Sequence, residues 1–261
     1  MNERKGKPNH RQEPREVVAE NVVCGRNALR ELLASGRSID KVLVQRGERD
    51  GSILELLREL RERKIPVIEV EKSKLDTITA HARHQGVVAY AAERDYCEVN
   101  DILAYASERG EAPLIIICDG VEDPHNLGAI IRTADCVGAH GVIIPKRRSV
   151  GLTSVVSKAS AGAIEHMRVA RVTNLAATID DLKEAGVWIY AADMDGKPYY
   201  EEGLKGAVAL VLGSEGFGIS RLVKEKCDFV LSIPLYGQVN SLNVSNAAAV
   251  LLCEIARQRN S

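Results

Sequence analysis

Three segments in the second half of the sequence place polar residues directly after a predicted strand. The first, DGVEDPHNLGAIIR, follows an apolar strand predicted over 114–119 and contains Asn126 and Arg132. Asn126 is a good N-cap for the helix that follows, and Arg132 lies off the apolar stripe of that helix. Taken alone, two such residues are more often a cap and a solvated helix residue than catalytic groups.

The second segment, LVLGSEGFGIS over 210–220, is a glycine-rich turn between a strand and a helix. Gly213, Gly216 and Gly218 would let the backbone approach a ligand and present its N–H groups. Their order differs from the G-x-G-x-x-G of dinucleotide sites, and the lysine of a P-loop is missing after the last glycine. Glu215 would repel a phosphate, so the turn suits a ligand that is cationic or carries hydroxyl groups.

The third segment, IPLYGQVNSLNVSNAAA over 233–249, is a polar loop that leads into a helix. Ser241 and Asn243 belong to a run of polar residues longer than one helix cap requires. The alanines at 247–249 predict that something packs very close to the first turns of this helix. Open α/β sheets bind ligands at the carboxyl ends of their strands, which is where all three segments lie.

Strand and helix patterns alternate on both sides of residue 95. The front part predicts a small α/β unit, with helices over 25–36 and 52–64 and strands over 41–45, 66–70 and 86–92. The rest predicts a parallel sheet covered on both faces, because near-continuous apolar strands alternate with helices. These strands are expected over 114–119, 141–145, 187–193, 208–213 and 229–234, and the helices near 126–138, 174–185, 219–226 and 243–259.

The chain is thus divided into four parts. They are a flexible polar tail over 1–20, a small α/β unit over 21–95, a linker over 96–111 that carries one helix, and a larger α/β unit over 112–261.

Charge is nearly balanced over the whole chain, with 35 Lys+Arg against 36 Asp+Glu in 261 residues and a formal net charge of -1. An evenly spread charge of this size argues against a nucleic-acid partner. The distribution is uneven, however: residues 1–95 hold 19 basic and 16 acidic residues, and residues 96–261 hold 16 and 20. A front part with a net charge of +3 leaves a polyanionic partner open.

Membrane and secreted classes are excluded by the pattern of apolar residues. No apolar run approaches the roughly 20 residues that span a bilayer, and the N-terminus lacks the apolar core of a secretory signal. The six cysteines are scattered and form no C-x-x-C pair. They predict reduced thiols in a cytoplasmic protein, with neither a disulfide framework nor a metal site.

Together, the three segments resemble the motifs of the SpoU-type RNA ribose 2'-O-methyltransferases of the SPOUT superfamily. The resemblance rests on DGVxDPHNLGAIIRTAD, VLGSEGxG and IPLYGxVxSLNVSxA in this order, and it covers about 112–261. The front part is similar to the L30e-like RNA-binding domain of the bacterial 23S rRNA guanosine 2'-O-methyltransferase subgroup, with H-Q-G at 84–86. The resemblance implies a mostly parallel α/β sheet, a C-terminal trefoil knot and a homodimer with its active site near the interface.

The resemblance also implies roles for individual residues. S-adenosylmethionine (SAM) would be held by the backbone around Gly213, Ile233 and Leu242, and no metal is needed. The catalytic positions of the family match Asn126, Arg132, Glu215, Ser241 and Asn243. A ribose hydroxyl needs a proton acceptor or a stabilised oxyanion. Because arginine is normally protonated, Arg132 is expected to be either an unusually deprotonated base or a clamp on the phosphate and the developing alkoxide.

The expected function is SAM-dependent 2'-O-methylation of a guanosine in 23S ribosomal RNA. A guanosine in tRNA stays open, as does a non-catalytic role in RNA binding or ribosome assembly, whereas the lack of an early G-x-G-x-x-G argues against an oxidoreductase. RNA capture is expected from the front part, where the candidate phosphate contacts are Lys5, Lys7, Arg11, Arg46, Arg49, Arg61 and Arg63.

Overall fold

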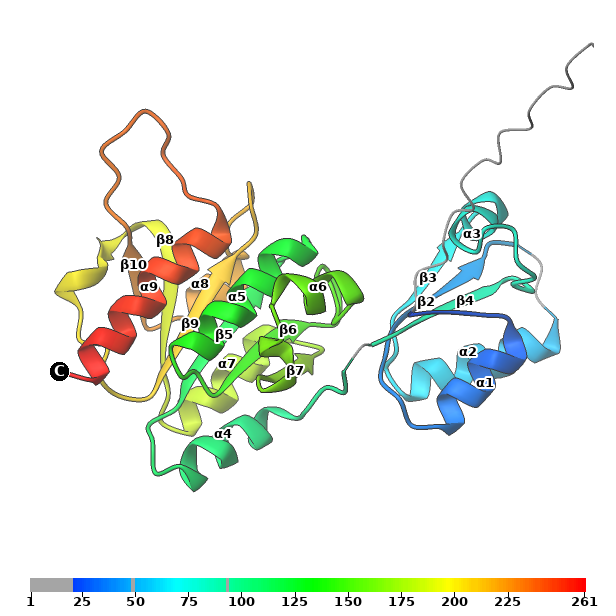
Figure 1. The fold of residues 1–261 in the computed structure, drawn as a ribbon, viewed down its shortest axis with the longest axis horizontal. Helices are drawn as coiled ribbons and strands as arrows, with labels where there is room; N and C mark the ends of the chain where they lie inside the picture. The colour runs from blue at the N-terminus through cyan, green and yellow to red at the C-terminus, as the bar shows by residue number, and fades with distance from the viewer. Residues whose placement is uncertain (1–20, 48–49, 93) are drawn as a thin grey trace, which may run out of the picture.

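The computed structural model describes residues 21–47, 50–92 and 94–261, which form two α/β units next to each other (Figure 1). The tail predicted over 1–20 lies outside these residues, as do the candidate RNA contacts Lys5, Lys7, Arg11 and Arg49. Each unit has its own sheet and its own buried core. Within the described ranges, no helix is long and apolar enough to cross a membrane.

The N-terminal unit is a four-stranded sheet with helices on both faces. Its strand order is β1-β4-β2-β3, in which β4 is antiparallel to β1 and β2, and β3 is parallel to β2. Leu29 and Leu56 pack α1 and α2 on one face, and Leu75 packs α3 on the other. The elements are β1 (Val22–Cys24), α1 (Arg26–Ala34), β2 (Ile39–Gln45), α2 (Gly51–Glu62), β3 (Val67–Val70), α3 (Lys72–Ile78) and β4 (Val87–Ala91).

The H-Q-G motif at 84–86 shapes the loop between α3 and β4. The ring of His84 is buried, with Nε2 lying 2.9 Å from Asp76 Oδ1 and Nδ1 accepting a hydrogen bond from Gly86 N at 3.0 Å. Gln85 Oε1 accepts a hydrogen bond from the backbone N–H of Arg26, at the start of α1. The motif therefore ties this loop to α3 and to α1.

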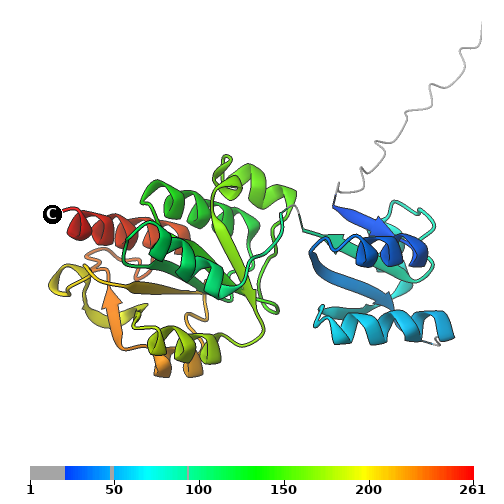
Figure 2. The same cartoon turned by 90° about the horizontal axis from the view of Figure 1, so that it is seen from below.

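The C-terminal unit is a six-stranded sheet in which every pair of neighbouring strands is parallel. The strand order is β10-β8-β9-β5-β6-β7. Ile116 of β5 belongs to the core shared with α5, α6 and α9, and Ile117 belongs to the core shared with α4, α7 and α8. Helices therefore cover both faces, as the apolar strands predict, and Figure 2 shows α7 and α9 on opposite sides of the sheet.

The bounds of these elements follow the chain. They are α4 (Val99–Glu108), β5 (Leu114–Asp119), α5 (Pro124–Cys136), β6 (Gly141–Pro145), α6 (Ser154–Ala159), η1 (Ala163–Glu165), β7 (Arg168–Val172), α7 (Leu175–Glu184), β8 (Trp188–Pro198), η2 (Tyr199–Glu201), β9 (Val208–Gly213), α8 (Arg221–Lys226), β10 (Phe229–Ser232) and α9 (Val244–Arg259).

The strand order reverses between β5 and β9, in the middle of the larger sheet. From β5 the chain continues through β6 and β7 on one side, whereas β8, β9 and β10 lie on the other. In the register of this pair, Asp119 lies opposite Gly213. The first two motifs therefore begin side by side at the point of an open α/β sheet where ligands usually bind.

Candidate active site

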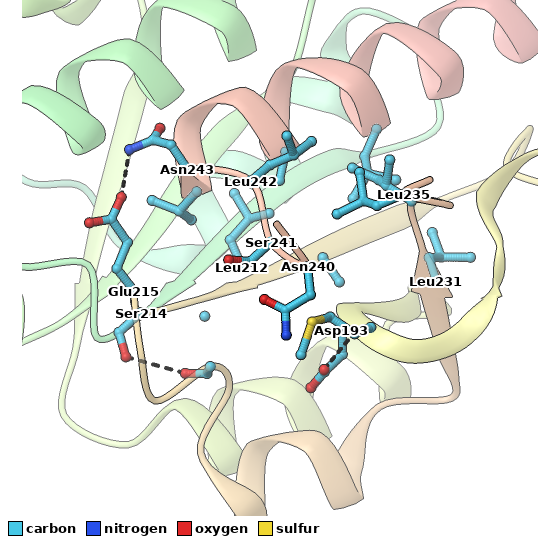
Figure 3. A pocket seen from close by; sticks show the side chains of 18 of the residues that line it. Asp193, Leu212, Ser214, Glu215, Leu231, Leu235, Asn240, Ser241, Leu242 and Asn243 are labelled. Atoms are coloured by element: carbon cyan, nitrogen blue, oxygen red, sulfur yellow. Dashed lines mark hydrogen bonds between the residues drawn. The ribbon is translucent and has the colours of Figure 1, made fainter. Parts of the chain in front are cut away.

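A pocket of about 630 Å³ lies at the carboxyl ends of β8, β9 and β10, beside the start of α9 (Figure 3). Glycine-turn residues, the loop after β10 and the first turns of α9 line it. Six of the eight predicted site residues contribute to this lining, namely Gly213, Glu215, Ile233, Ser241, Leu242 and Asn243. The second and third motifs thus meet in one cavity.

Asn126, Glu215 and Asn243 form a hydrogen-bonded cluster that joins all three motifs. Glu215 Oε1 accepts hydrogen bonds from Asn126 Nδ2 at 3.1 Å and from Asn243 Nδ2 at 2.5 Å. Asn243 Nδ2 also donates to Asn126 Oδ1 at 2.9 Å. Glu215 Oε2 accepts no hydrogen bond from the residues that the structure describes. The cluster thus holds one carboxylate oxygen and leaves the other for a ligand.

The prediction that Asn126 caps its helix is wrong. Helix α5 begins at Pro124, and its N-cap is Asp123, whose Oδ1 accepts a hydrogen bond from His125 N at 2.8 Å. Proline is favoured at the first helical position because its fixed φ suits a helix and it has no N–H to satisfy. Asn126 therefore lies inside the first turn, where its side-chain amide is available to Glu215 and Asn243.

Asn243 performs the capping role at the third motif. Its Oδ1 accepts hydrogen bonds from Ser245 N at 3.0 Å and Asn246 N at 3.4 Å, at the start of α9. The same side chain therefore caps the helix with its oxygen and contacts the cluster with its nitrogen. This double use explains why the loop is more polar than a simple cap needs.

The glycine turn is held closed by its own backbone. Ser214 and Gly218 exchange backbone hydrogen bonds at 3.0 and 2.9 Å. A Cβ at Gly213 would overlap the backbone of Gly218 and Ile219, so only glycine fits where the turn folds back. Asp119 Oδ2 accepts a hydrogen bond from Ser220 N at 2.7 Å, which ties the end of β5 to the start of α8.

Arg132 does not line the pocket. It is exposed on α5, and among the described residues its side chain forms no hydrogen bond or ion pair. It follows Asn126 by six residues, which is about 9 Å along a helix axis. The structure therefore brings five of the predicted catalytic and cofactor positions to the glycine turn and the third motif, adds Asn126 and Asn243 through their contact, and leaves Arg132 outside.

Asp193, at the end of β8, is a pocket residue that the sequence motifs did not reveal. Lys224 Nζ donates to Asp193 Oδ2 and Asp195 Oδ1, each at 2.8 Å, and the two carboxylates raise the pKa of Lys224. Asp193 is therefore paired, whereas the carboxylate of Glu215 contacts only neutral amides. The one sequence signal for Asp193 is its place after a predicted strand.

A metal ion has no cluster of ligands in the part of the chain that the structure describes, since no three His, Cys, Asp or Glu side chains lie together. The pocket instead combines apolar walls, an acidic group and amide side chains. These groups suit an organic ligand that carries both an apolar ring and a positive charge.

Comparison with known proteins shows the same two units. Residues 113–253 match the model of the SpoU rRNA methylase family, and residues 22–97 match that of the RNA 2'-O ribose methyltransferase substrate-binding domain. A Staphylococcus haemolyticus protein, whose name places it in the TrmH family of tRNA/rRNA methyltransferases, is 48% identical over 239 residues. That alignment covers 91% of this chain and 96% of the relative.

Solved structures with both units are also similar. The SpoU methyltransferase AviRb from Streptomyces viridochromogenes, crystallised with AdoMet, has a TM-score of 0.58 and 26% identity, and the match covers 92% of this chain and 90% of AviRb. An AdoMet-bound rRNA methyltransferase from Sinorhizobium meliloti has a TM-score of 0.56 and 26% identity, covering 90% and 86%. With its motifs, its fold and these matches in agreement, the chain belongs to the SpoU/TrmH family of RNA methyltransferases.

Proposed function

We propose that this methyltransferase transfers the methyl group of SAM to the 2'-hydroxyl of a guanosine in 23S ribosomal RNA. The observation that carries the proposal is the contact of Asn126, Glu215 and Asn243 at one pocket. These residues are separated by 89 and 117 positions in the sequence, so the three motifs serve a common site.

SAM fits the residues that line the pocket. Ile233 and Leu242 offer an apolar slot for adenine, and Gly213 has no side chain to keep the backbone from the ligand. Glu215 supplies negative charge where a cationic ligand would lie. When bound, SAM supplies a methyl group activated by a positively charged sulfur.

Glu215 is also the proton acceptor that the pocket offers. The other lining carboxylate, Asp193, is engaged by Lys224, whereas Glu215 Oε2 accepts no hydrogen bond from the described residues. Asn126 and Asn243 hold Glu215 Oε1, so Oε2 is kept in place to accept the proton of the ribose 2'-hydroxyl. The Ser241 side chain lines the same cavity and would orient the ribose.

Arg132 acts as a clamp in this mechanism, not as a base. An exposed guanidinium stays protonated, because nothing around it disfavours the charged form. Its position outside the pocket supports a homodimer in which Arg132 of one chain reaches the RNA at the pocket of the other. There it would bind a phosphate and stabilise the developing alkoxide.

Mixed dimers test this sharing of the site. R132A and E215A should each reduce methyl transfer strongly as pure proteins. After unfolding and refolding as a mixture, some dimers carry both substitutions on one side and leave the other site intact, so part of the wild-type activity should return. Lack of any recovery, with mixed dimers confirmed by mass spectrometry, would mean that each chain uses its own Arg132.

The substrate is tested by transfer of labelled methyl from SAM to RNA of a strain that lacks the gene. Separated 23S RNA and tRNA are offered in parallel, and the modified ribose is mapped. Label on a base, or on tRNA alone, contradicts the first choice, and a tRNA guanosine is the alternative that the names of the relatives favour. Absence of SAM binding in calorimetry would favour a non-catalytic RNA-binding role.

The proposal includes a C-terminal trefoil knot and RNA capture by an L30e-like unit over about 21–95. Support for the knot comes from Gly196 in β8, where a Cβ would lie 2.5 Å from the backbone of Val230. The two chain segments therefore cross in direct backbone contact, as a threaded chain requires. Support for RNA capture comes from the match of residues 22–97 to a substrate-binding domain.

A further inference from the structure

A buried ion pair links the N-terminal unit to the larger sheet. Asp40 of β2 and Arg171 of β7 have side chains that are 5% and 6% exposed, and Arg171 Nη1 lies 3.2 Å from Asp40 Oδ1. The guanidinium also donates to Ile39 O at 3.3 Å and to Lys146 O at 3.4 Å, so it binds backbone of both units. Arg171 therefore lies at the centre of the junction.

Tyr96 and Gly151 complete the junction. The Tyr96 hydroxyl donates to Asp40 Oδ1 and accepts a hydrogen bond from Leu152 N at 2.9 Å. Its ring lies against Arg171, whose Cζ is 5.2 Å from the ring centroid. A Cβ at Gly151 would overlap the carboxylate of Asp40, so the larger unit has a glycine where the N-terminal unit inserts this side chain.

The junction is a poor source of stability. Asp40 Oδ2 and Arg171 Nε are buried and have no hydrogen-bond partner in the described part of the chain. Burial raises the pKa of Asp40, against the opposing effects of Tyr96 and Arg171. Apolar residues of similar size often stabilise a protein as well as a buried ion pair does. Directional contacts, in contrast, restrict the two units to one relative position.

We propose that Asp40, Tyr96 and Arg171 are positioning residues that fix the N-terminal unit relative to the SAM pocket, and thereby select the ribose that is methylated. The proposal rests on the proposed function. β7 is the edge strand of the sheet, and β9, which begins the glycine turn, is three strand spacings away, or about 14 Å. RNA held by the N-terminal unit would thus present a nucleotide to the pocket across a rigid sheet of constant width.

A disulfide that can be opened and closed tests the role of position. The contact between Gly151 and Asp40 brings the two Cβ positions within the roughly 3.5–4.5 Å that a disulfide spans, so D40C/G151C should crosslink the units on oxidation. A C136S/C253S background removes the exposed native thiols. The D40C and G151C single variants, treated alike, are the controls.

The readout is methyl transfer to 23S RNA at saturating SAM, with mapping of every methylated ribose. Reduced D40C/G151C lacks the ion pair, and we expect kcat/KM for RNA at least tenfold below wild type, with label on additional riboses and unchanged SAM affinity. Oxidation should restore most of the rate and the single target. Equal rates and products in both redox states would overturn the proposal, as would failure of the disulfide to form.

A second variant separates positioning from folding. D40L/R171M replaces the pair with apolar side chains, and its Tm is expected to equal or exceed that of wild type while kcat/KM for RNA falls. A purely structural role predicts instead that activity follows Tm, and wild-type activity in this stable variant would contradict the proposal. If wild-type protein methylates no RNA, the proposed function itself fails, which is distinct from a normal wild type with insensitive variants.

Discussion

Asn243 uses both ends of its side-chain amide, and this determines what a substitution there removes. The oxygen caps α9, and the nitrogen contacts Asn126 and Glu215. The sequence pattern could predict the cap, because asparagine before an apolar helix is a known signal. It could not predict the contact with Asn126, which depends on how α5 and α9 pack.

Two substitutions at Asn243 separate these roles. Serine is an equally good cap, so N243S should lie within about 0.5 kcal/mol of the wild-type free energy of unfolding, whereas N243A should lose about 1 kcal/mol. Both remove the amide that holds Glu215, so both should reduce methyl transfer at least tenfold. Urea unfolding and single-turnover methylation measure the two effects. An active N243S would show that the amide contact is dispensable.

At the scale of elements, the buried strands were predicted well, and the short edge elements were not. The strands over 114–119, 141–145 and 208–213 are confirmed as β5, β6 and β9, because continuous apolar runs define strands buried on both faces. β7 was missed because Arg168 and Arg171 interrupt its pattern. Arg171 instead serves the junction, a role that depends on the packing of the two units.

The closed glycine turn between β9 and α8 leads to a sharp contrast between two glycines. A Cβ at Gly213 overlaps backbone, so G213A must displace the turn and with it Glu215. Gly237, in the loop after β10, has no atom within 4 Å of such a Cβ. We expect G213A to lose SAM binding in calorimetry and G237A to retain it. Similar SAM affinity in the two variants would mean that the turn can move without loss.

The last turns of α9 carry a pH-dependent contribution to stability. Glu254 accepts hydrogen bonds from Arg257 and Gln258, which lower its pKa from 4.5 to about 2. A lowered pKa in the folded chain means that ionised Glu254 stabilises the fold above pH 4.5, and that this contribution is lost as the pH falls towards 2.

Replacement of Glu254 by glutamine therefore should have an effect that depends on pH. E254Q is expected to be less stable than wild type by about 1 kcal/mol at pH 7, with a difference that disappears near pH 2. Urea unfolding over this range measures it. E225Q, which removes an exposed ion pair with Arg221, should show a smaller change at all pH values.

At the scale of the whole molecule, the basic front part meets RNA with fewer free cations than its composition indicates. Arg46 is paired with Glu71 and Arg63 with Glu59, each within the N-terminal unit. Arg61 is exposed, and no described residue forms an ion pair with it. A count of charges could locate the RNA-binding part, but the pairing depends on the packing of α2 and on neighbouring loops.

The salt dependence of RNA binding should distinguish these arginines. R61A is expected to lower the slope of log Kd against log salt concentration by about one, because one phosphate contact is lost. R63A removes a side chain that already binds Glu59 and Leu33 O, so the slope should stay unchanged while Tm falls. Filter binding to 23S RNA gives both slopes. Equal slope changes would contradict this assignment.

The separation in sequence between Asn126, Glu215 and Asn243 has a consequence for how the protein is assembled. The strands of the N-terminal sheet all lie within 22–91, whereas the pocket closes only when segments 89 and 117 residues apart meet. Distant contacts form slowly because long loops must close first. A refolding chain would therefore pass through a stage that holds RNA without the cofactor, and in that stage it occupies its own substrate as an inhibitor of finished enzyme.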